Sequence, residues 1–425
     1  MTNENNLSYF FIFKEKKWFL FSIVLIIILS LVEANGQGDF HIFLSASKDL
    51  IEKENIYTNN YNQYYHYFYD LSFALILYPL TFLPIYFAKL IWLLFNGFLL
   101  FRIWKLIRAY LPQDAFTKKG EVLVTILSFV FVLRVLQANL HLAQLTIFIL
   151  FLTLEAIHQI QVKKRHYLGG FLLAWGICIK LLPIVFIPYL IFRAEWKGLL
   201  FTTINCLFIL FIPVLFIGID FNFFLLNERW KLINPSNKQH ILDTEERSFH
   251  SLTTLISTLF YQNTGEQFVL SYKRNIAELS IDQIAKVILI VRLIFVGFTL
   301  YFLNSLPFRE ARSRIQSLYE ISYICSIIPL IFPHQQHYAF FFILPSVVYL
   351  FYYYNHRFIR LKMGGKISKW VFIVLISISY LALNCHLLLG SYREIYDHFK
   401  ILTYGAILLI LILGFCRPKF IEISK

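Results

Sequence analysis

The sequence predicts an all-α polytopic membrane protein, a single integral membrane domain over residues 1–425 with about 12 transmembrane helices. Hydrophobic residues make up 58% of the chain and charged residues 15%, whereas soluble domains average about 25% charged residues. The mean hydropathy is +0.63. A soluble core of this size could not bury so much apolar surface, but a bilayer can cover it. Helices are expected because each one satisfies its own backbone groups within lipid.

Apolar segments that could cross a bilayer recur along the chain, since one crossing needs about 20 residues. They cover 18–32, 88–108, 121–137, 142–160, 168–193, 198–219, 283–303, 315–332, 338–354, 370–390 and 399–416. The segment 168–193 is long, carries Lys180 and Pro183 in its middle and has basic residues on both flanks. Because proline interrupts a helix, we expect a tight hairpin of two short helices there, with its tip towards the outer face.

Lysine and arginine are distributed unevenly between the loops. The loops expected inside carry 24 of them, and the loops expected outside carry 10 although they are longer in total. Cytoplasmic loops are enriched in these residues. Both termini are therefore predicted to be cytoplasmic, with the large loops 33–87 and 220–282 outside the cell membrane. The net charge of +14 then reflects topology, and its scatter over short loops argues against a nucleic-acid partner.

Residues 71–86 leave two alternatives open. The run is apolar enough to be a further span. That interpretation would place the basic loop 102–119 outside, so we prefer a re-entrant or interfacial helix. The first apolar segment is expected to be an uncleaved anchor, since no small-residue cleavage pattern follows it.

The two large loops differ in character. In the first, Asp39 lies just beyond the first apolar segment, and apolar residues between Phe40 and Ile51 recur at helical spacing, which predicts an amphipathic helix lying on the membrane. A tyrosine run follows, which suits a membrane–water interface or a platform for sugars. It comprises Tyr61, Tyr64, Tyr65, Tyr67 and Tyr69. The second loop mixes acidic and basic residues and turns amphipathic at Phe249, as a cap over a membrane cavity would.

Several short motifs occur in a suggestive order. The first part of the chain holds Asp39-Phe40, Asn55-Ile56-Tyr57, Tyr67-Phe68-Tyr69, Tyr78-Pro79-Leu80, Leu83-Pro84, Ala88 and Ile91-Trp92. The later part holds Ala143-Gln144-Leu145-Thr146, Gly169, Gly170, Lys180-Leu181-Leu182-Pro183, His250-Ser251-Leu252, Pro329 and His334-Gln335-Gln336-His337. Their order and spacing resemble glycosyltransferase family 87, the polyprenol-phosphate-mannose-dependent α-mannosyltransferases and their relatives.

The resemblance covers roughly residues 18–350, and the chain departs from the family pattern in two places. The family has a Gly-Gln-x-Asn block where this chain has Ala143 before Gln144 and Thr146 after it. Prolines are usual after the Tyr-x-Tyr block, and here Asp70-Leu71 replaces them. These departures bear on donor and acceptor identity more than on the fold.

The resemblance implies a GT-C fold and a hexosyltransferase reaction. Such an enzyme moves a hexose, mannose in the family described, from a polyprenyl-phosphate sugar to an acceptor hydroxyl, with inversion. The acceptor would be a lipid-linked or cell-envelope glycan. This chemistry needs a base near the acceptor hydroxyl and positive charge near the departing phosphate.

Candidate residues for these roles follow. Asp39 is the expected base, with a solvated loop acid as its alternative. Lys180 interrupts an apolar run, where an ionisable residue is functional by default, so we assign it to the phosphate of the donor. Further phosphate candidates are Arg134, His334 and His337, for which snorkelling or structural roles are alternatives. The candidates for contacts with sugar or acceptor are Gln144, Tyr57, Tyr69 and Ser251.

Two other classes of membrane protein are alternatives, a polysaccharide polymerase or ligase and a transporter or flippase. A polysaccharide polymerase or ligase also has many spans and a large late outer loop, but it usually lacks a large first loop with an acid beside the first helix. A transporter or flippase would show repeated halves with broken helices at matching positions, and only 168–193 is broken. No cofactor is expected, and a divalent metal is left open. Asp39 has no neighbouring acid, His334 and His337 have no evident third ligand, and the cysteines form no C-x-x-C pair.

Overall fold

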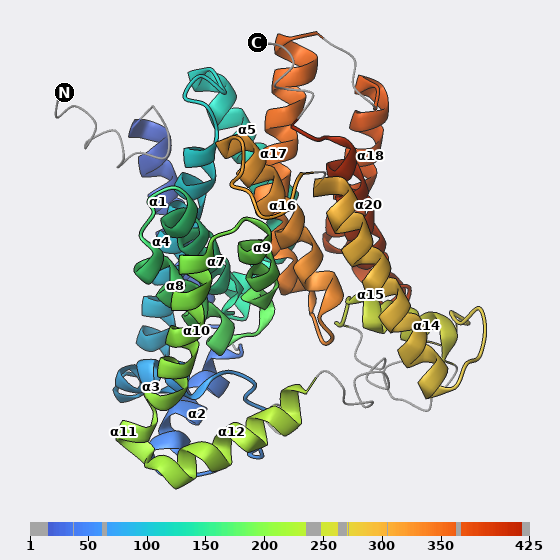
Figure 1. Cartoon of the computed structure of the whole chain (residues 1–425). Coiled ribbons are helices and arrows are strands. Elements are labelled where there is room, and N and C mark those ends of the chain that lie inside the picture. Colours follow the sequence, from blue (N-terminus) through green and yellow to red (C-terminus); the bar gives the residue numbers. More distant parts are fainter. Residues whose placement is uncertain are drawn as a thin grey trace, which may run out of the picture. The chain divides into compact units, whose positions relative to one another are not determined.

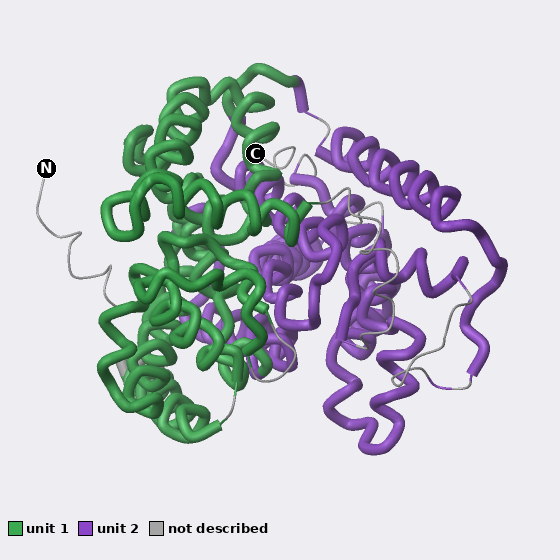
Figure 2. Tube along the Cα trace, turned by 90° about the horizontal axis from the view of Figure 1, so that it is seen from below, with its two compact units in different colours: residues 1–109, 138–234, 307–310 green, residues 110–137, 235–306, 311–425 purple. Residues whose placement is uncertain are grey.

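The computed structural model describes residues 16–418, apart from 37, 62–65, 235–247, 262–269, 271, 304 and 363–366. Within these residues the fold is helical, and one isolated β-bridge pairs Phe249 with Gln336 (Figure 1). The chain divides into two compact units (Figure 2). Unit 1 holds residues 1–109, 138–234 and 307–310, and unit 2 holds residues 110–137, 235–306 and 311–425. The single domain over 1–425 stays a prediction.

Unit 1 carries the first helices and the middle of the chain. Its elements are α1 (Lys16–Glu33), α2 (Phe40–Ile51), α3 (Leu71–Leu77), η2 (Tyr78–Phe82), α4 (Ile85–Tyr110), α7 (Thr146–Gln161), α8 (His166–Ile179), η3 (Leu182–Val185), α9 (Phe186–Phe192), α10 (Trp196–Phe211), α11 (Val214–Ile217) and α12 (Ile219–Ile233). Helix α6 (Leu133–His141) begins in unit 2 and ends in unit 1.

Unit 2 carries most of the later helices. Its elements are α5 (Lys118–Phe131), α14 (Leu252–Phe260), α15 (Ile281–Leu303), α16 (Arg314–Ile331), η4 (His337–Ile343), α17 (Leu344–Tyr354), η5 (Asn355–Arg360), α18 (Lys369–Asn384), η6 (Cys385–Leu387), η7 (Gly390–Tyr392), α19 (Arg393–His398) and α20 (Ile401–Phe415).

The long apolar helices indicate a membrane protein. In the described part of the chain, four helical stretches are long and apolar enough to cross a bilayer: Ile85–Tyr110, Trp196–Ile217, Ile281–Leu303 and Lys369–Leu387. Two bent pairs, Lys118–Phe131 with Leu133–His141 and Gly390–His398 with Ile401–Phe415, would bring the number to six. The predicted segments 88–108, 198–219, 283–303 and 370–390 coincide with the four stretches. The total of about 12 crossings stays a prediction, since shorter apolar helices make up the difference.

The predicted hairpin in 168–193 is present. Helix α8 ends at Lys180, whose backbone is extended, and the chain returns through η3 and α9. The two ends of the hairpin meet, because the Lys164 ammonium lies 3.2 Å from a Glu195 carboxylate oxygen. The Gln161 amide also donates to the Tyr189 hydroxyl at 3.2 Å. Lys180 therefore lies at the turn of a helical hairpin, as the sequence predicts.

Glycines set how closely α8 packs. A Cβ on Gly170 would lie 2.7 Å from the Phe201 Cβ and 2.8 Å from backbone atoms of α10, and one on Gly169 would lie 2.5 Å from the Ile160 side chain on α7. Since real Cβ atoms do not approach so closely, the glycine pair is what lets α8 lie directly against both neighbours.

Two predictions for the first loop have different outcomes. The amphipathic helix is present as α2, but its apolar residues Phe40 and Phe43 are buried inside unit 1, where Phe40 stacks on Trp92 at 5.9 Å. The protein covers this face, which the sequence assigned to the membrane. Residues 71–82 form α3 and η2, too short together to cross a bilayer. The re-entrant or interfacial interpretation of 71–86 therefore stays a prediction.

Candidate functional site

Asp39 lies at the start of α2, against the loop formed by residues 141–145. A Cβ on Gly38 would lie 3.0 Å from the carbonyl oxygens of His141 and Leu142. Because glycine has no side chain, the backbone comes close enough for the Asp39 amide to donate to the Leu142 carbonyl at 3.1 Å. The glycine at position 38 therefore allows Asp39 to lie against this loop.

Helix α4 holds the 141–145 loop in place. The buried Lys89 ammonium donates to the carbonyl oxygens of Gly36 at 2.8 Å and His141 at 3.2 Å. The Trp92 indole donates to the Ala143 carbonyl at 2.9 Å. Ala143 itself has a left-handed backbone, with φ 52°, a conformation that favours glycine. An alanine in this conformation is strained. The family pattern has glycine at this position.

Four side chains predicted from the sequence meet in unit 1. The Gln144 amide, which is fully buried, donates to the Asp39 carboxylate, and the Tyr69 hydroxyl donates to the Gln144 side-chain oxygen at 3.4 Å. The Lys180 ammonium lies 5.7 Å from the centroid of the Tyr69 ring. It also lies within electrostatic range of the Asp39 carboxylate. A carboxylate, an amide, a phenol and an ammonium thus form one connected group.

Tyr57 supports this group from behind. Its hydroxyl donates to the Tyr69 carbonyl at 2.9 Å, and its side chain is 3% exposed. Burial raises the pKa of Tyr57 above its usual range, so the phenol keeps its proton and remains a donor. This geometry gives Tyr57 a structural contact, and its predicted contact with sugar or acceptor stays a prediction. Tyr64 and Tyr65 lie outside the described residues.

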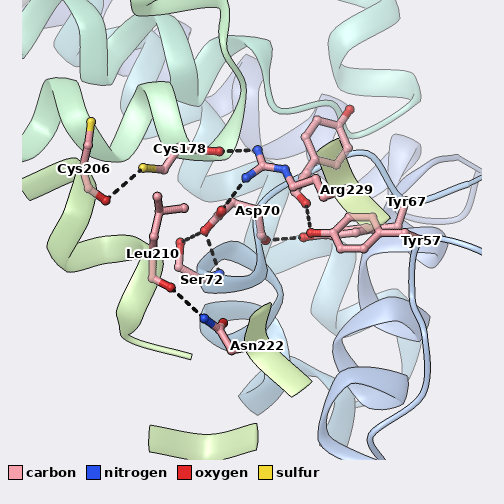
Figure 3. Close-up of polar contacts among 10 residues, drawn as sticks. Tyr57, Tyr67, Asp70, Ser72, Cys178, Cys206, Leu210, Asn222 and Arg229 are labelled. Carbon is pink, nitrogen blue, oxygen red and sulfur yellow. Dashed lines mark hydrogen bonds and ion pairs between the residues drawn. The ribbon is translucent and has the colours of Figure 1, made fainter. Parts of the chain in front are cut away.

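A buried ion pair lies beside the group, and the sequence analysis did not identify it (Figure 3). Arg229 of α12 pairs with Asp70 at 2.6 Å, and both side chains are less than 9% exposed. Asp70 also caps α3 by accepting from the Ser72 amide at 2.9 Å. The Asp-x-Ser sequence is a recognisable helix-start signal, but nothing near Arg229 in the sequence indicates its partner.

In unit 2, Arg134 is buried at the start of α6. Its guanidinium donates to the Tyr396 hydroxyl at 2.7 Å, lies 3.6 Å from an Asp397 carboxylate oxygen and sits 4.8 Å from the centroid of the Tyr396 ring. The Arg134 amide donates to the Asn384 side chain at 3.2 Å. The protein thus holds the Arg134 guanidinium in a buried position, and its predicted contact with the phosphate stays a prediction.

His250 lies in the same buried cluster. Its Nε2 is 3.6 Å from an Asp397 oxygen. Burial, and then the charges of Lys400 and Arg134, lower the pKa of His250 well below its usual range. The ring is therefore neutral at neutral pH, so its approach to Asp397 is not an ion pair there. Among the described residues, neither ring nitrogen has a hydrogen-bond partner.

The remaining predicted residues of unit 2 have distinct environments. His337 lies within electrostatic range of Arg134 and Asp397. His334 has a left-handed backbone, with φ 55°, and stacks on Phe249 with 4.9 Å between the ring centroids. The buried Ser251 hydroxyl caps α14 by accepting from the Thr254 amide at 3.2 Å. Capping explains the serine, and its predicted contact with the acceptor stays a prediction.

The predicted residues thus fall into two groups. Unit 1 brings together Asp39, Gln144, Tyr69 and Lys180, with Tyr57 behind them, and unit 2 brings together Arg134 and His337. Within the described residues, no group of three or more His, Cys, Asp or Glu side chains could hold a metal ion. The five cysteines are all described, and they are free. That the protein needs no cofactor stays a prediction.

Comparison with known proteins agrees with the sequence resemblance. The model of glycosyltransferase family 87 matches residues 67–312, which is more than half of the chain. This range contains Tyr69, Arg134, Gln144, Lys180 and Ser251, whereas Asp39 precedes it. No curated protein matches the chain. The extent of the family match shows that the chain belongs to glycosyltransferase family 87.

Proposed function

We propose that this glycosyltransferase moves a hexose, specifically mannose, from a polyprenyl-phosphate sugar to an acceptor hydroxyl on a lipid-linked or cell-envelope glycan, with inversion. The observation that carries the proposal is the connected group in unit 1. Its carboxylate and its ammonium, our candidates for the base and the cation that the chemistry requires, are connected through Gln144 and Tyr69. The family match supports the transfer of a sugar, and the donor and acceptor classes rest on the resemblance of the motifs.

Asp39 is the proposed general base. The acceptor oxygen attacks the anomeric carbon as the bond between that carbon and the phosphate oxygen breaks, and the hydroxyl proton passes to Asp39. The bonding electrons leave with the polyprenyl phosphate. The Gln144 amide orients the Asp39 carboxylate, so one oxygen can be aimed at the acceptor without loss of side-chain freedom during the reaction.

Lys180 is the proposed partner of the departing phosphate. Its ammonium would stabilise the negative charge that grows on the leaving oxygen, which replaces the need for a general acid. Arg134, His334 and His337 are further proposed phosphate contacts, and Gln144, Tyr57, Tyr69 and Ser251 are proposed contacts with the sugar or acceptor. We propose the cell membrane as the location, with the site on its outer side and no nucleic-acid partner.

The first test measures transfer by Asp39→Asn. The protein, purified and reconstituted in lipid nanodiscs, is offered a panel of polyprenyl-phosphate sugars with a membrane glycan extract as acceptor. Asparagine keeps the shape and can still accept from Gln144, but it is not basic. Transfer should fall by about 10²- to 10⁴-fold, the range for acid–base groups, while donor binding stays near that of the wild type.

Asp49→Asn is the matched control. Asp49 is a second carboxylate on α2, where it accepts a hydrogen bond from the Tyr61 hydroxyl at 2.8 Å. We propose no part for it in the reaction. Its substitution should leave transfer intact. Turnover like that of the wild type in Asp39→Asn would end the role of Asp39 as the base, and no transfer from any donor in the panel would end the proposed function.

A further inference from the structure

The ion pair between Arg229 and Asp70 is unusual in being almost fully buried. Asp70 is 1% exposed and Arg229 is 6% exposed. Removing two charges from water is costly, and apolar residues of similar volume often serve stability equally well. Stability alone is therefore a weak reason for this pair. Asp70 also stands where the family pattern has a proline, which could accept no such partner.

The guanidinium of Arg229 joins two separate segments of the site. One nitrogen pairs with Asp70 at 2.6 Å, and Asp70 directly follows Tyr69 in the chain. The other nitrogen donates to the carbonyl of Cys178 at 2.5 Å, two residues before Lys180 (Figure 3). This carbonyl belongs to the last turn of α8, where carbonyl groups lack partners within the helix and attract positive charge. One side chain thus holds both the Tyr69 segment and the Lys180 segment.

The Tyr69 segment has little freedom once Arg229 is in place. The Tyr57 hydroxyl donates to the carbonyl of Tyr69, and the Tyr67 hydroxyl donates to the carbonyl of Asp70, each at 2.9 Å. The second oxygen of Asp70 accepts from the Ser72 hydroxyl at 2.6 Å and from its amide. The backbone on both sides of the Tyr69–Asp70 peptide is therefore fixed, and Arg229 connects it by hydrogen bonds to the end of α8.

Helix α12 carries Arg229 on its buried stripe. Asn222, Leu225 and Arg229 follow one another at helical spacing and are buried, and the Asn222 amide donates to the Leu210 carbonyl at 3.2 Å. On the other side, Phe223, Phe224 and Trp230 are about half exposed. Arg229 therefore links α12, which begins the second predicted outer loop, to the segments that carry Tyr69 and Lys180.

We propose that Arg229 is a positioning residue, which sets the distance between Lys180 and Tyr69 and thereby the place of the donor phosphate relative to Asp39. The inference rests on the proposed function. Arg229 contacts Asp70 and the carbonyl of Cys178, so we expect it to act on the reaction through Lys180. A change in the orientation of Arg229 would move the ammonium of Lys180 by way of the last turn of α8.

Arg229→Lys is the variant that separates positioning from charge. A lysine ammonium keeps the positive charge but cannot hold two acceptors with the fixed fork of a guanidinium. We expect the variant to fold and its single-turnover rate to fall by about 10- to 100-fold, as displacements near 1 Å can do. Arg193→Lys is the matched control, because Arg193 is also buried and donates to a backbone carbonyl, that of Arg309, at 3.0 Å. It should transfer at the wild-type rate.

A double-mutant cycle with Lys180→Met shows whether Arg229 acts through Lys180. In the Lys180→Met background, Arg229→Lys should cause almost no further loss, because the group that it positions is gone. If the rate of the double variant instead falls by the product of the two single-variant losses, the inference is overturned. If Arg229→Lys does not fold, Asp70→Asn replaces it in the cycle, since asparagine still caps α3 but does not pair with the guanidinium as an ion.

A measurement independent of transfer keeps this inference distinct from the proposed function. The rate at which an acylating reagent modifies Lys180 is followed by peptide mass spectrometry, with the exposed Lys163 as the internal reference. Arg229→Lys should change the rate at Lys180 and leave the rate at Lys163 unchanged. Equal rates at Lys180 in both proteins would overturn the positioning role, even if wild-type protein transferred sugar. If Arg229→Lys changes the acylation rate at Lys180 but the wild-type protein transfers no sugar, the positioning role is supported and only the proposed sugar transfer is refuted.

Discussion

A single ammonium can stabilise a departing phosphate if it lies where the negative charge develops. Lys180 lies at the turn between α8 and η3, over the Tyr69 ring, and the Asp39 carboxylate acts on it electrostatically. The phosphodiester of the donor carries one negative charge, and the departing polyprenyl monophosphate carries close to two. The pairing would strengthen as the bond to the sugar breaks, because charge builds on the leaving oxygen.

Lys180→Met should therefore weaken donor binding and slow transfer together, whereas Lys180→Arg should recover part of both, since charge matters more than shape for a phosphate. Donor affinity and the single-turnover rate are the two measurements. Lys163→Met is the control, since Lys163 is an exposed lysine on the basic flank of the same hairpin. A Lys180→Met protein that binds and turns over like the wild type would move the phosphate site elsewhere, with Arg134 the next candidate.

Ala143 provides a test of strain beside the site. Its φ of 52° costs an L-residue about 1–2 kcal/mol relative to glycine, and the greater freedom of glycine in the unfolded chain takes back about 0.4–1 kcal/mol. Ala143→Gly should therefore stabilise the protein by roughly 0.5–1 kcal/mol, seen as a higher Tm in detergent. Ala138→Gly, within α6, should lower the Tm because glycine weakens a helix interior. A lower Tm for Ala143→Gly would show that the turn is not strained.

At the residue scale, the sequence points to side chains that are out of place in their segments. Lys180 and Arg134 were identified because charge is costly in an apolar run, and Asp39 and Gln144 because motif order marked them. Asp70 and Arg229 were missed because each alone resembles a solvated loop residue. Their burial arises from a pairing across 159 positions, and only the fold brings the two charges together.

At the scale of elements, the length of an apolar segment and the breaks in it predict where helices begin and end. The sequence does not show what covers the apolar face of a helix. The helices Ile85–Tyr110 and Ile281–Leu303 lie where hydropathy placed them, and the break at Lys180 was foreseen from Pro183. The sequence predicts helix α2 too, but the apolar face of this helix packs on Trp92 and Phe73 within the protein. Periodicity shows that a face is apolar and does not show whether lipid or protein covers it.

The packing of α8 on α10 gives an element-scale prediction. Gly170→Ala would force a methyl group to 2.7 Å from the Phe201 Cβ and 2.8 Å from the backbone of Thr202, which the rigid backbone of α10 cannot relieve. Overpacking of this kind typically costs about 1–3 kcal/mol, so the Tm should fall. Gly297→Ala on α15 is the control. A Cβ there has open space, so the Tm should rise by the helix propensity of alanine. Equal effects at both positions would refute close packing at Gly170.

At the scale of the whole molecule, the sequence and the structure differ in the number of membrane-crossing helices that they indicate. The described part of the chain has four long apolar stretches, or six with the bent pairs, whereas the whole sequence predicts about 12 crossings. The difference lies in shorter elements such as α7 and α8, which are 16 and 14 residues long and mostly buried. Helices of that length cross a bilayer where it thins around them or where flanking residues snorkel to the interface, so these shorter helices account for the remaining predicted crossings.

Orientation in the membrane follows from charge, and it yields the last prediction. Basic residues resist translocation, so short loops rich in lysine and arginine stay inside. The 24 basic residues in one set of loops against 10 in the other predict that both termini are in the cytoplasm and that α12 is outside. Cysteines are introduced singly at the exposed positions Asn227 of α12 and Lys369 of α18, and intact cells are treated with a membrane-impermeant maleimide. Asn227→Cys should be labelled in intact cells, and Lys369→Cys only after permeabilisation. The reverse pattern would invert the topology and place the proposed site on the cytoplasmic side, where it would need a donor facing that leaflet.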